Sequence, residues 1–234
     1  MLITWRLLAD DPATIRFRLL RDGKPIHDSR VGEATAFVDK KGSTTSRYAV
    51  QPIGDKRAPS PAMMWDKSYL SIPLTPPADG VTPAGESFSY TANDASAADL
   101  DGDGRYEIIL KWDPTNSHDN SQGGYSGSVL LDAYRLDGTR LWRIDLGRNI
   151  RAGAHYTQFL AFDFDGDGRA EVAMKTADGT VDGTGTVIGD ARADWRGHDG
   201  EVPQRDRTGA KILPDGTKVA PMQGRIVKGP EYLT

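Results

Sequence analysis

The residues with the clearest chemistry are acidic side chains in two loops that repeat one pattern. In this pattern three Asp alternate with other residues and a Glu follows: Asp99, Asp101, Asp103 and Glu107, then Asp163, Asp165, Asp167 and Glu171. Every matched position is offset by 64 residues. Carboxylates at alternate positions of a tight turn converge on a hard cation, and Ca²⁺ takes about 6 to 8 oxygen ligands. The pattern predicts two calcium-binding loops, for which the alternative is a pair of solvated Asp-Gly turns.

Other positions of the loops fit the same interpretation. Gly104 and Gly168 stand sixth, where glycine permits a sharp turn. Arg105 and Arg169 stand seventh, and their backbone carbonyls are the expected ligands. An EF-hand would need Glu at the twelfth position, whereas the acidic residue here is the ninth, on a strand-like run with no flanking helix pattern. We therefore expect calcium loops embedded between strands.

Further polar residues lie between and beside the loops. Asn93 precedes the first loop, Lys111 and Asp113 end the strand after it, His155 lies between the repeats and Lys175 follows the second loop. Each has a structural alternative. Lys111 and Lys175 could be solvated strand ends, and His155 could be a hydrogen-bonded loop residue. Asn93 could cap a turn, and Asp113, followed by Pro, could begin one.

The elements that must position these residues are predicted to be strands. Of the 33 acidic residues, 27 are Asp, and with 26 Gly and 14 Pro they favour turns over helices. Residues 2–8, 15–20, 36–39 and 46–52 are expected strands, with a hairpin turn at Asp22-Gly23. Residues 1–64 are therefore predicted to form a small β-sandwich-like domain. The Pro-rich residues 52–61 and 73–83 are interpreted as linkers.

Residues 65–234 are predicted to contain tandem four-stranded units. Expected strands at 129–136 and 141–146 flank an Asp137-Gly138 turn and follow the first acidic loop and its strand. Tandem four-stranded units are typical of β-propeller blades. The region holds about two blades, the second incomplete and interrupted by an insertion at about 197–228, so we expect a truncated propeller. Trp65, Trp112 and Trp142 are expected to pack in cores.

Composition excludes several function classes. The net charge of −4 gives no general attraction to nucleic acid. No apolar run approaches the roughly 18 to 20 residues needed to cross a bilayer, and the first residues lack a signal-peptide pattern. The absence of Cys excludes disulfides and thiolate sites. We expect neither a nucleic-acid partner nor a membrane partner.

Several longer motifs closely resemble the rhamnogalacturonan lyases of polysaccharide lyase family 11. They are Asn93-Asp-Ala-Ser, the first acidic loop, Leu110-Lys-Trp-Asp-Pro-Thr-Asn116, Leu131-Asp-Ala-Tyr-Arg-Leu-Asp-Gly-Thr139, Ile150-Arg-Ala-Gly-Ala-His-Tyr-Thr-Gln-Phe159 and Met174-Lys-Thr-Ala-Asp-Gly-Thr-Val-Asp-Gly-Thr184. The resemblance implies an all-β protein: a fibronectin III-like β-domain followed by an eight-bladed, calcium-binding β-propeller. It also implies cleavage of the anionic pectic polysaccharide rhamnogalacturonan I by β-elimination, a monomer when complete, and extracellular or periplasmic action.

The resemblance also assigns roles to particular residues. Asn93 and Asp113 match positions that help to hold an active-site calcium ion, which would act as a Lewis acid on the substrate carboxylate. The family's catalytic Arg and Lys come from later blades, so His155 and Lys175 are only weak candidates here, and the chain alone is expected to be inactive. The competing interpretation is a non-catalytic calcium-loop β-propeller used for carbohydrate binding or adhesion.

Overall fold

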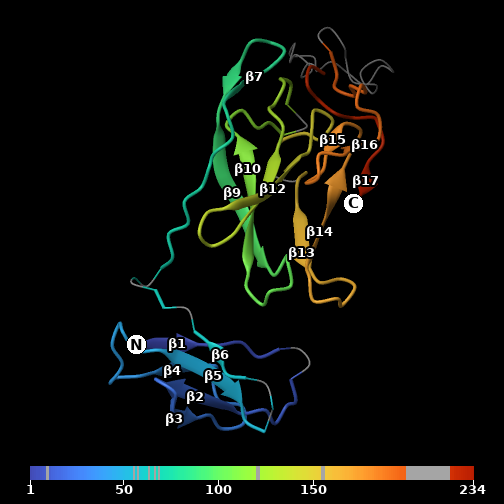
Figure 1. Ribbon diagram of the computed structural model, residues 1–234. Helices are drawn as coiled ribbons and strands as arrows, with labels where there is room; N and C mark the ends of the chain where they lie inside the picture. The colour runs from blue at the N-terminus through green and yellow to red at the C-terminus, as the bar shows by residue number, and fades with distance from the viewer. Residues whose placement is uncertain are drawn as a thin grey trace, which may run out of the picture. The chain divides into compact units, whose positions relative to one another are not determined.

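A computed structural model of the chain describes residues 1–8, 11–54, 56, 58–62, 64, 65, 67, 69–119, 122–153, 156–198 and 222–234. His155 and most of the predicted insertion, residues 199–221, lie outside this set. The described residues form strands and turns and contain no helix, so the predicted all-β class is confirmed, and none of them forms a helix suited to crossing a bilayer. The chain divides into two compact units, Met1–Ser71 and Ile72–Thr234 (Figure 1).

The first unit contains two antiparallel sheets with a common core. One sheet pairs β1 (Leu2–Thr4) with β4 (Ala36–Val38). The other has the order β3 (Lys24–Asp28), β2 (Phe17–Arg21), β5 (Tyr48–Pro52) and β6 (Ser60–Pro61). The buried side chains of Ile3, Leu19 and Tyr48 join the two sheets. Asp22 and Gly23 form the predicted β2–β3 turn, both with positive φ.

Two expectations for this part of the chain were wrong. Residues 52–61 are not wholly a linker, because Ser60 and Pro61 add β6 to the edge of β5. Pro is accepted there because an edge strand leaves one side of its backbone without a partner strand. Trp65 is 46% exposed and is therefore not a core residue.

The second unit is built around a six-stranded antiparallel sheet. Its strand order is β16 (Val187–Ile188), β15 (Thr180–Val181), β12 (Arg140–Asp145), β11 (Leu130–Tyr134), β10 (Glu107–Pro114) and β9 (Tyr90–Ala98). A second sheet has the order β13 (Phe159–Phe162), β14 (Glu171–Thr176) and β17 (Tyr232–Leu233). A short hairpin joins β7 (Gly80–Val81) to β8 (Ser87–Phe88), so the segment 73–83 that we expected to be a linker ends in the first strand of a hairpin.

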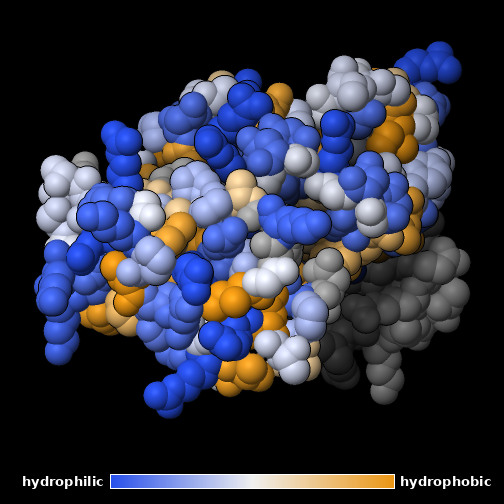
Figure 2. All heavy atoms as spheres, turned by 60° about the horizontal axis from the view of Figure 1, so that its bottom comes forward, coloured by the Kyte–Doolittle hydropathy of each residue, from blue (hydrophilic) through white to orange (hydrophobic). Residues whose placement is uncertain are grey.

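Apolar side chains from both sheets form one core. Ile109 and Leu131 of the large sheet and Met174 of β14 belong to a single buried cluster, which also includes Leu146 and Ile150. Figure 1 shows β13 and β14 standing beside the large sheet. Burial of this apolar surface provides the main stabilisation of the arrangement. On the face drawn in Figure 2 hydrophilic residues predominate and hydrophobic ones gather in smaller groups.

A bulge in β9 determines where its polar residues lie. The pairing with β10 runs through Leu110↔Ala95 and resumes at Trp112↔Ala92, so Asn93 and Asp94 together face Lys111 alone. A bulge of this kind bends the strand and redirects its side chains. The two polar residues of β9 thereby share one position of β10, opposite Lys111.

Buried charge anchors the centre of the large sheet. Asp132 is fully buried and accepts hydrogen bonds from Arg143 Nε (2.6 Å) and Nη2 (2.7 Å). It also accepts from Trp112 Nε1 at 2.9 Å and from the Tyr134 hydroxyl at 2.7 Å. Trp112 is thus a core residue as predicted, and Trp142 packs against the larger cluster.

Candidate functional site

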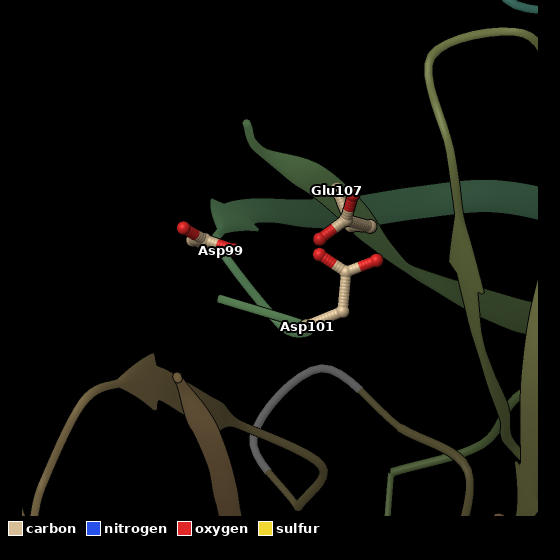
Figure 3. Close-up of side chains that lie close together, drawn as sticks. All are labelled: Asp99, Asp101 and Glu107. Atoms are coloured by element: carbon tan, nitrogen blue, oxygen red, sulfur yellow. The ribbon is translucent and has the colours of Figure 1, made fainter. Parts of the chain in front are cut away.

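The two acidic loops each gather three carboxylates. One oxygen from each of Asp99, Asp101 and Glu107 lies within 4.8 Å of the others, and Asp163, Asp165 and Glu171 form the equivalent group. Figure 3 shows the carboxylates of Asp101 and Glu107 pointing toward one another, with Asp99 beside them. Either group could hold a metal ion.

The loops also repeat each other in their hydrogen bonds. Asp99 Oδ1 accepts from Gly102 N and Oδ2 from Gly104 N, both at 2.8 Å. Asp163 does the same for Gly166 N and Gly168 N at 2.7 and 2.9 Å. Gly104 and Gly168 both have positive φ, as the predicted turn requires. Each turn is therefore held by hydrogen bonds from its backbone amides to the carboxylate of its first Asp.

The third Asp of each loop, Asp103 or Asp167, lies outside the group of three carboxylates. Asp103 Oδ1 accepts from the backbone amide of Arg105 at 2.8 Å, and Asp167 Oδ1 accepts from that of Arg169 at 2.8 Å. The backbone carbonyls of Arg105 and Arg169 stay predicted ligands.

The first loop is the more buried of the two, and its Asp101 forms an ion pair with Arg135 at 3.1 Å. Burial raises the pKa of Glu107, and repulsion from Asp101, Asp103 and Asp99 adds to the effect. Its Oε2 accepts a hydrogen bond from Leu100 N at 2.9 Å. A cation held by these oxygens would relieve the repulsion, so the donor set suits a hard metal ion.

The two loops are in direct contact. The backbone amide of Ala170, in the second loop, donates to the Asp99 carbonyl at 2.7 Å. A Cβ atom at Gly102 would lie 3.2 Å from Arg169 Cγ, which shows how closely the loops approach. This contact joins the two sheets at the loop end.

A separate pocket of about 450 Å³ lies at the other end of β9 and β10. Its lining residues come from these strands and from the segments that follow: Asn93, Asp94, Lys111, Asp113, Ser117, His118, Asp119 and Gly153. The structure thus brings together Asn93 and Asp113, the two residues singled out in the sequence. The bulge in β9 and the end of β10 explain why they meet.

Asp113 has an unsatisfied atom in this pocket. Its Oδ1 is buried and has no hydrogen-bond partner among the described residues. Burial raises the pKa of Asp113, Lys111 opposes this rise, and Asp94 adds to it. A buried carboxylate oxygen without a partner costs free energy, so the site suits a cation that would bind it.

Lys111 does not behave as a solvated strand end, which corrects that expectation. Its side chain is 5% exposed, and Nζ forms an ion pair with Asp94 Oδ2 at 2.6 Å. The reason is that both faces of β10 are covered here, since the consecutive residues 109–112, which alternate between the two faces, are all buried. In the sequence Asp94 is notable only as the neighbour of Asn93, and the lining residues Ser117, His118 and Asp119 belong to no recognisable motif.

Of the two other catalytic candidates, Lys175 is described and is not among the lining residues. Lys175 lies on β14, where Nζ pairs with Glu231 Oε1 at 3.0 Å and faces the Tyr156 ring at 5.8 Å. His155 lies outside the described residues. The described pocket therefore contains Lys111, and no Arg, among its lining residues.

Known proteins similar to this chain are lyases. The chain is 52% identical to the rhamnogalacturonan endolyase YesW and 50% identical to the rhamnogalacturonan exolyase YesX, both from Bacillus subtilis (strain 168). Each match covers 99% of this chain and 34% of the relative, so the chain spans about a third of the length of these relatives. The crystal structure of YesX has a TM-score of 0.79 and 51% identity, covering 100% of this chain and 35% of that one. The Bacillus licheniformis rhamnogalacturonan lyase PL11 has the same TM-score at 52% identity, covering 100% and 36%.

Family comparison divides the chain into two matched regions. Residues 1–65 match the family described as "Rhamnogalacturonan I lyases beta-sheet domain". Residues 69–207 match "Rhamnogalacturonan lyase family 11, C-terminal domain", and because this match covers more than half of the sequence, the chain belongs to rhamnogalacturonan lyase family 11.

Proposed function

We propose that this chain supplies part of a calcium-dependent lyase that cleaves the backbone of rhamnogalacturonan I by β-elimination at galacturonate. The observation that carries the proposal is the unpartnered, buried Asp113 Oδ1 in a pocket that also contains Asn93. The chain that contains this pocket is 50–52% identical to rhamnogalacturonan lyases over almost the whole of its own length.

Asn93 and Asp113 would hold the calcium ion of this site. When bound there, calcium would withdraw charge from the uronate carboxylate and so favour loss of the C5 proton and breakage of the C4–O bond. The lining residues explain why a cation is needed. Three carboxylates, from Asp94, Asp113 and Asp119, would repel an anionic substrate, and Lys111 compensates only part of their charge.

Architecture and location belong to the same proposal. We assign residues 1–64 to a fibronectin III-like β-domain and residues 65–234 to the start of an eight-bladed propeller, with the two acidic loops as further calcium sites. The antiparallel strands β9–β12 match one four-stranded blade in number and order, which supports this assignment. Extracellular or periplasmic action follows from the size of the polymer substrate.

The test is a lyase assay on two proteins. One is the 234-residue chain, and the other is a chimera in which the chain replaces the matching third of the Bacillus subtilis endolyase YesW. Each is incubated with rhamnogalacturonan I and calcium while the ultraviolet absorbance of the unsaturated uronate is followed. We expect product from the chimera and none from the chain alone.

A pair of variants tests the site itself. Asp113→Asn in the chimera should lower kcat/KM by about 100-fold or more, because one metal-binding oxygen and its charge are lost. Asp182→Asn is the matched control, since Asp182 caps an exposed turn through Thr184 N and Thr186 N and does not line the pocket. A chimera that binds the polysaccharide and forms no unsaturated product would instead support a carbohydrate-binding function.

A further inference from the structure

Arg151 is a buried cation whose hydrogen bonds go to backbone carbonyls. The residue is 4% exposed. Its three guanidinium nitrogens donate to carbonyl oxygens from two segments of the chain: His118 (3.3 Å), Asp119 (3.4 Å), Gln122 (2.8 Å), Gly124 (2.6 Å) and Gly224. A planar guanidinium offers five N–H groups in a fixed geometry, so it can join several carbonyls at once.

Four of these carbonyls belong to the segment that forms one wall of the pocket. We call residues 117–119 and 122–126 the wall loop. Ser117, His118 and Asp119 line the pocket, and Arg151 binds the backbone of the same loop. Gly153, two residues after Arg151, also lines the pocket.

Backbone contacts tie the segment of Arg151 to this loop. His118 N donates to Ala152 O at 3.0 Å, and Ala152 N donates to Ser126 Oγ at 3.3 Å. A Cβ atom at Gly153 would lie 2.7 Å from His118 O, so the two backbones are in direct contact. Arg151 therefore lies where the loop and its supporting segment meet.

The fifth carbonyl, that of Gly224, comes from the described C-terminal part of the predicted insertion. Gly124 N donates to Gln223 O at 2.8 Å, and Gly224 N donates to Gly197 O at 2.9 Å. A Cβ atom at Gly224 would lie 2.0 Å from Gly124 O, and Gly224 has a φ of +70°. Gln223 and Gly224 are thus packed against the wall loop, and the guanidinium of Arg151 bonds both to that loop and to Gly224.

We propose that Arg151 is a positioning residue: by binding the carbonyls of the wall loop and of Gly224, it fixes the pocket wall that presents Ser117, His118 and Asp119. The part of this inference that concerns catalysis rests on the proposed lyase function. The part that concerns the position of the wall loop is independent of that function.

Hydrogen exchange of the chain tests the structural part directly. In Arg151→Lys a single ammonium cannot reach the same carbonyls, so amides of the wall loop and of residues 222–226 should exchange about tenfold faster or more. Exchange in β10 and β11 should stay within about twofold of the parent. Arg143→Lys is the matched control, because Arg143 is a partly buried guanidinium that binds Asp132 and not the loop. It should leave wall-loop exchange unchanged.

A second variant keeps the test decisive if Arg151→Lys does not fold. Gly224→Ala places a methyl group against Gly124 and should accelerate exchange in the wall loop while Arg151 is intact. Parent-like exchange of the wall loop in Arg151→Lys, or equal acceleration throughout β10 and β11, would overturn the inference.

The catalytic part is measured in the chimera with YesW. Arg151→Lys should lower kcat/KM by about tenfold or more, mainly through a higher KM, because the wall that orients substrate is loosened. Arg143→Lys should stay within about twofold. If the parent chimera has no activity the proposed function fails, and the exchange experiment still decides the role of Arg151. Normal kinetics of Arg151→Lys in an active chimera would refute a positioning role in catalysis.

Discussion

Lys111 Nζ lies 2.6 Å from Asp94 Oδ2, and the two partners differ greatly in exposure. The Lys111 side chain is 5% exposed and that of Asp94 is 69% exposed. Loss of the carboxylate would leave a buried ammonium with one partner fewer, whereas loss of the ammonium would leave an aspartate that water can solvate. The pair is therefore asymmetric in its contribution to stability.

We predict that Asp94→Ala lowers the free energy of unfolding by about 1 to 3 kcal/mol, because Lys111 loses its bound acceptor. Lys111→Met replaces the ammonium with an apolar chain of similar volume and should cost less than about 1 kcal/mol. Urea unfolding of both variants measures the difference. When Asp94→Ala is added to Lys111→Met, it should change the free energy of unfolding very little, because no ammonium is left to lose its partner. Equal losses of stability in the two single variants would contradict the proposed asymmetry.

Asp132 gives a second stability prediction. Asp132→Asn keeps the shape of the side chain and removes the charge that binds Arg143, so we expect a loss of about 3 to 5 kcal/mol. Tyr134→Phe removes only one hydroxyl donor to Asp132 and should cost about 1 kcal/mol. Urea denaturation followed by Trp fluorescence compares them. A smaller loss for Asp132→Asn than for Tyr134→Phe would show that the charge matters little.

The acidic loops could be predicted from the sequence because their geometry is local. Asp99 and Asp163 accept bonds from amides three and five residues later, so the 64-residue repeat of the sequence reappears in the hydrogen bonds. Such turns depend on the identity of a few consecutive residues. The hairpin at Asp22-Gly23 was predicted for the same reason.

The pocket was only partly predictable because it depends on pairing between strands. Asn93 and Asp113 are recognisable in the sequence because both stand in motifs that resemble the lyase family. The bulge that brings Asn93 and Asp94 opposite Lys111 is set by the register of β9 on β10, which the sequence does not display. The burial of Lys111 follows from packing on both faces of β10, where residues 109–112 are all buried, and so its interpretation as a solvated strand end was wrong.

Calcium should stabilise the chain through the acidic loops. At a calcium concentration about 100 times the dissociation constant, binding to one loop adds about 2.7 kcal/mol to the free energy of unfolding. Glu107→Gln should lose most of this gain at the first loop, because one of its three clustered carboxylates is removed. Thermal unfolding with calcium and with a chelator measures the gain in each protein.

Two comparisons make this calcium experiment specific. Glu171→Gln alters the equivalent group of the second loop and should remove a separate part of the gain. Asp182→Ala disrupts an acidic turn outside both groups, so its effect should be the same with and without calcium. An unchanged calcium response in both Glu variants would show that the loops do not bind the ion.

Asp178 should make stability depend on pH in the acidic range. The Asp190 amide, Trp195 Nε1 and the Tyr232 hydroxyl all donate to its carboxylate, and together they hold the pKa of Asp178 below its ordinary value of 3.8. A group with a lowered folded-state pKa contributes stability above the unfolded pKa, and that contribution is lost as the pH falls through the folded pKa. The free energy of unfolding of the parent should therefore exceed that of Asp178→Asn at about pH 6, and the difference should shrink below about pH 3.8.

Tyr232→Phe removes one of the three donors to Asp178. The folded-state pKa of Asp178 should then move toward its ordinary value, and the stability of this variant should depend less on pH. Urea unfolding over this range tests both variants, and a difference between parent and Asp178→Asn that does not change with pH would refute the assignment.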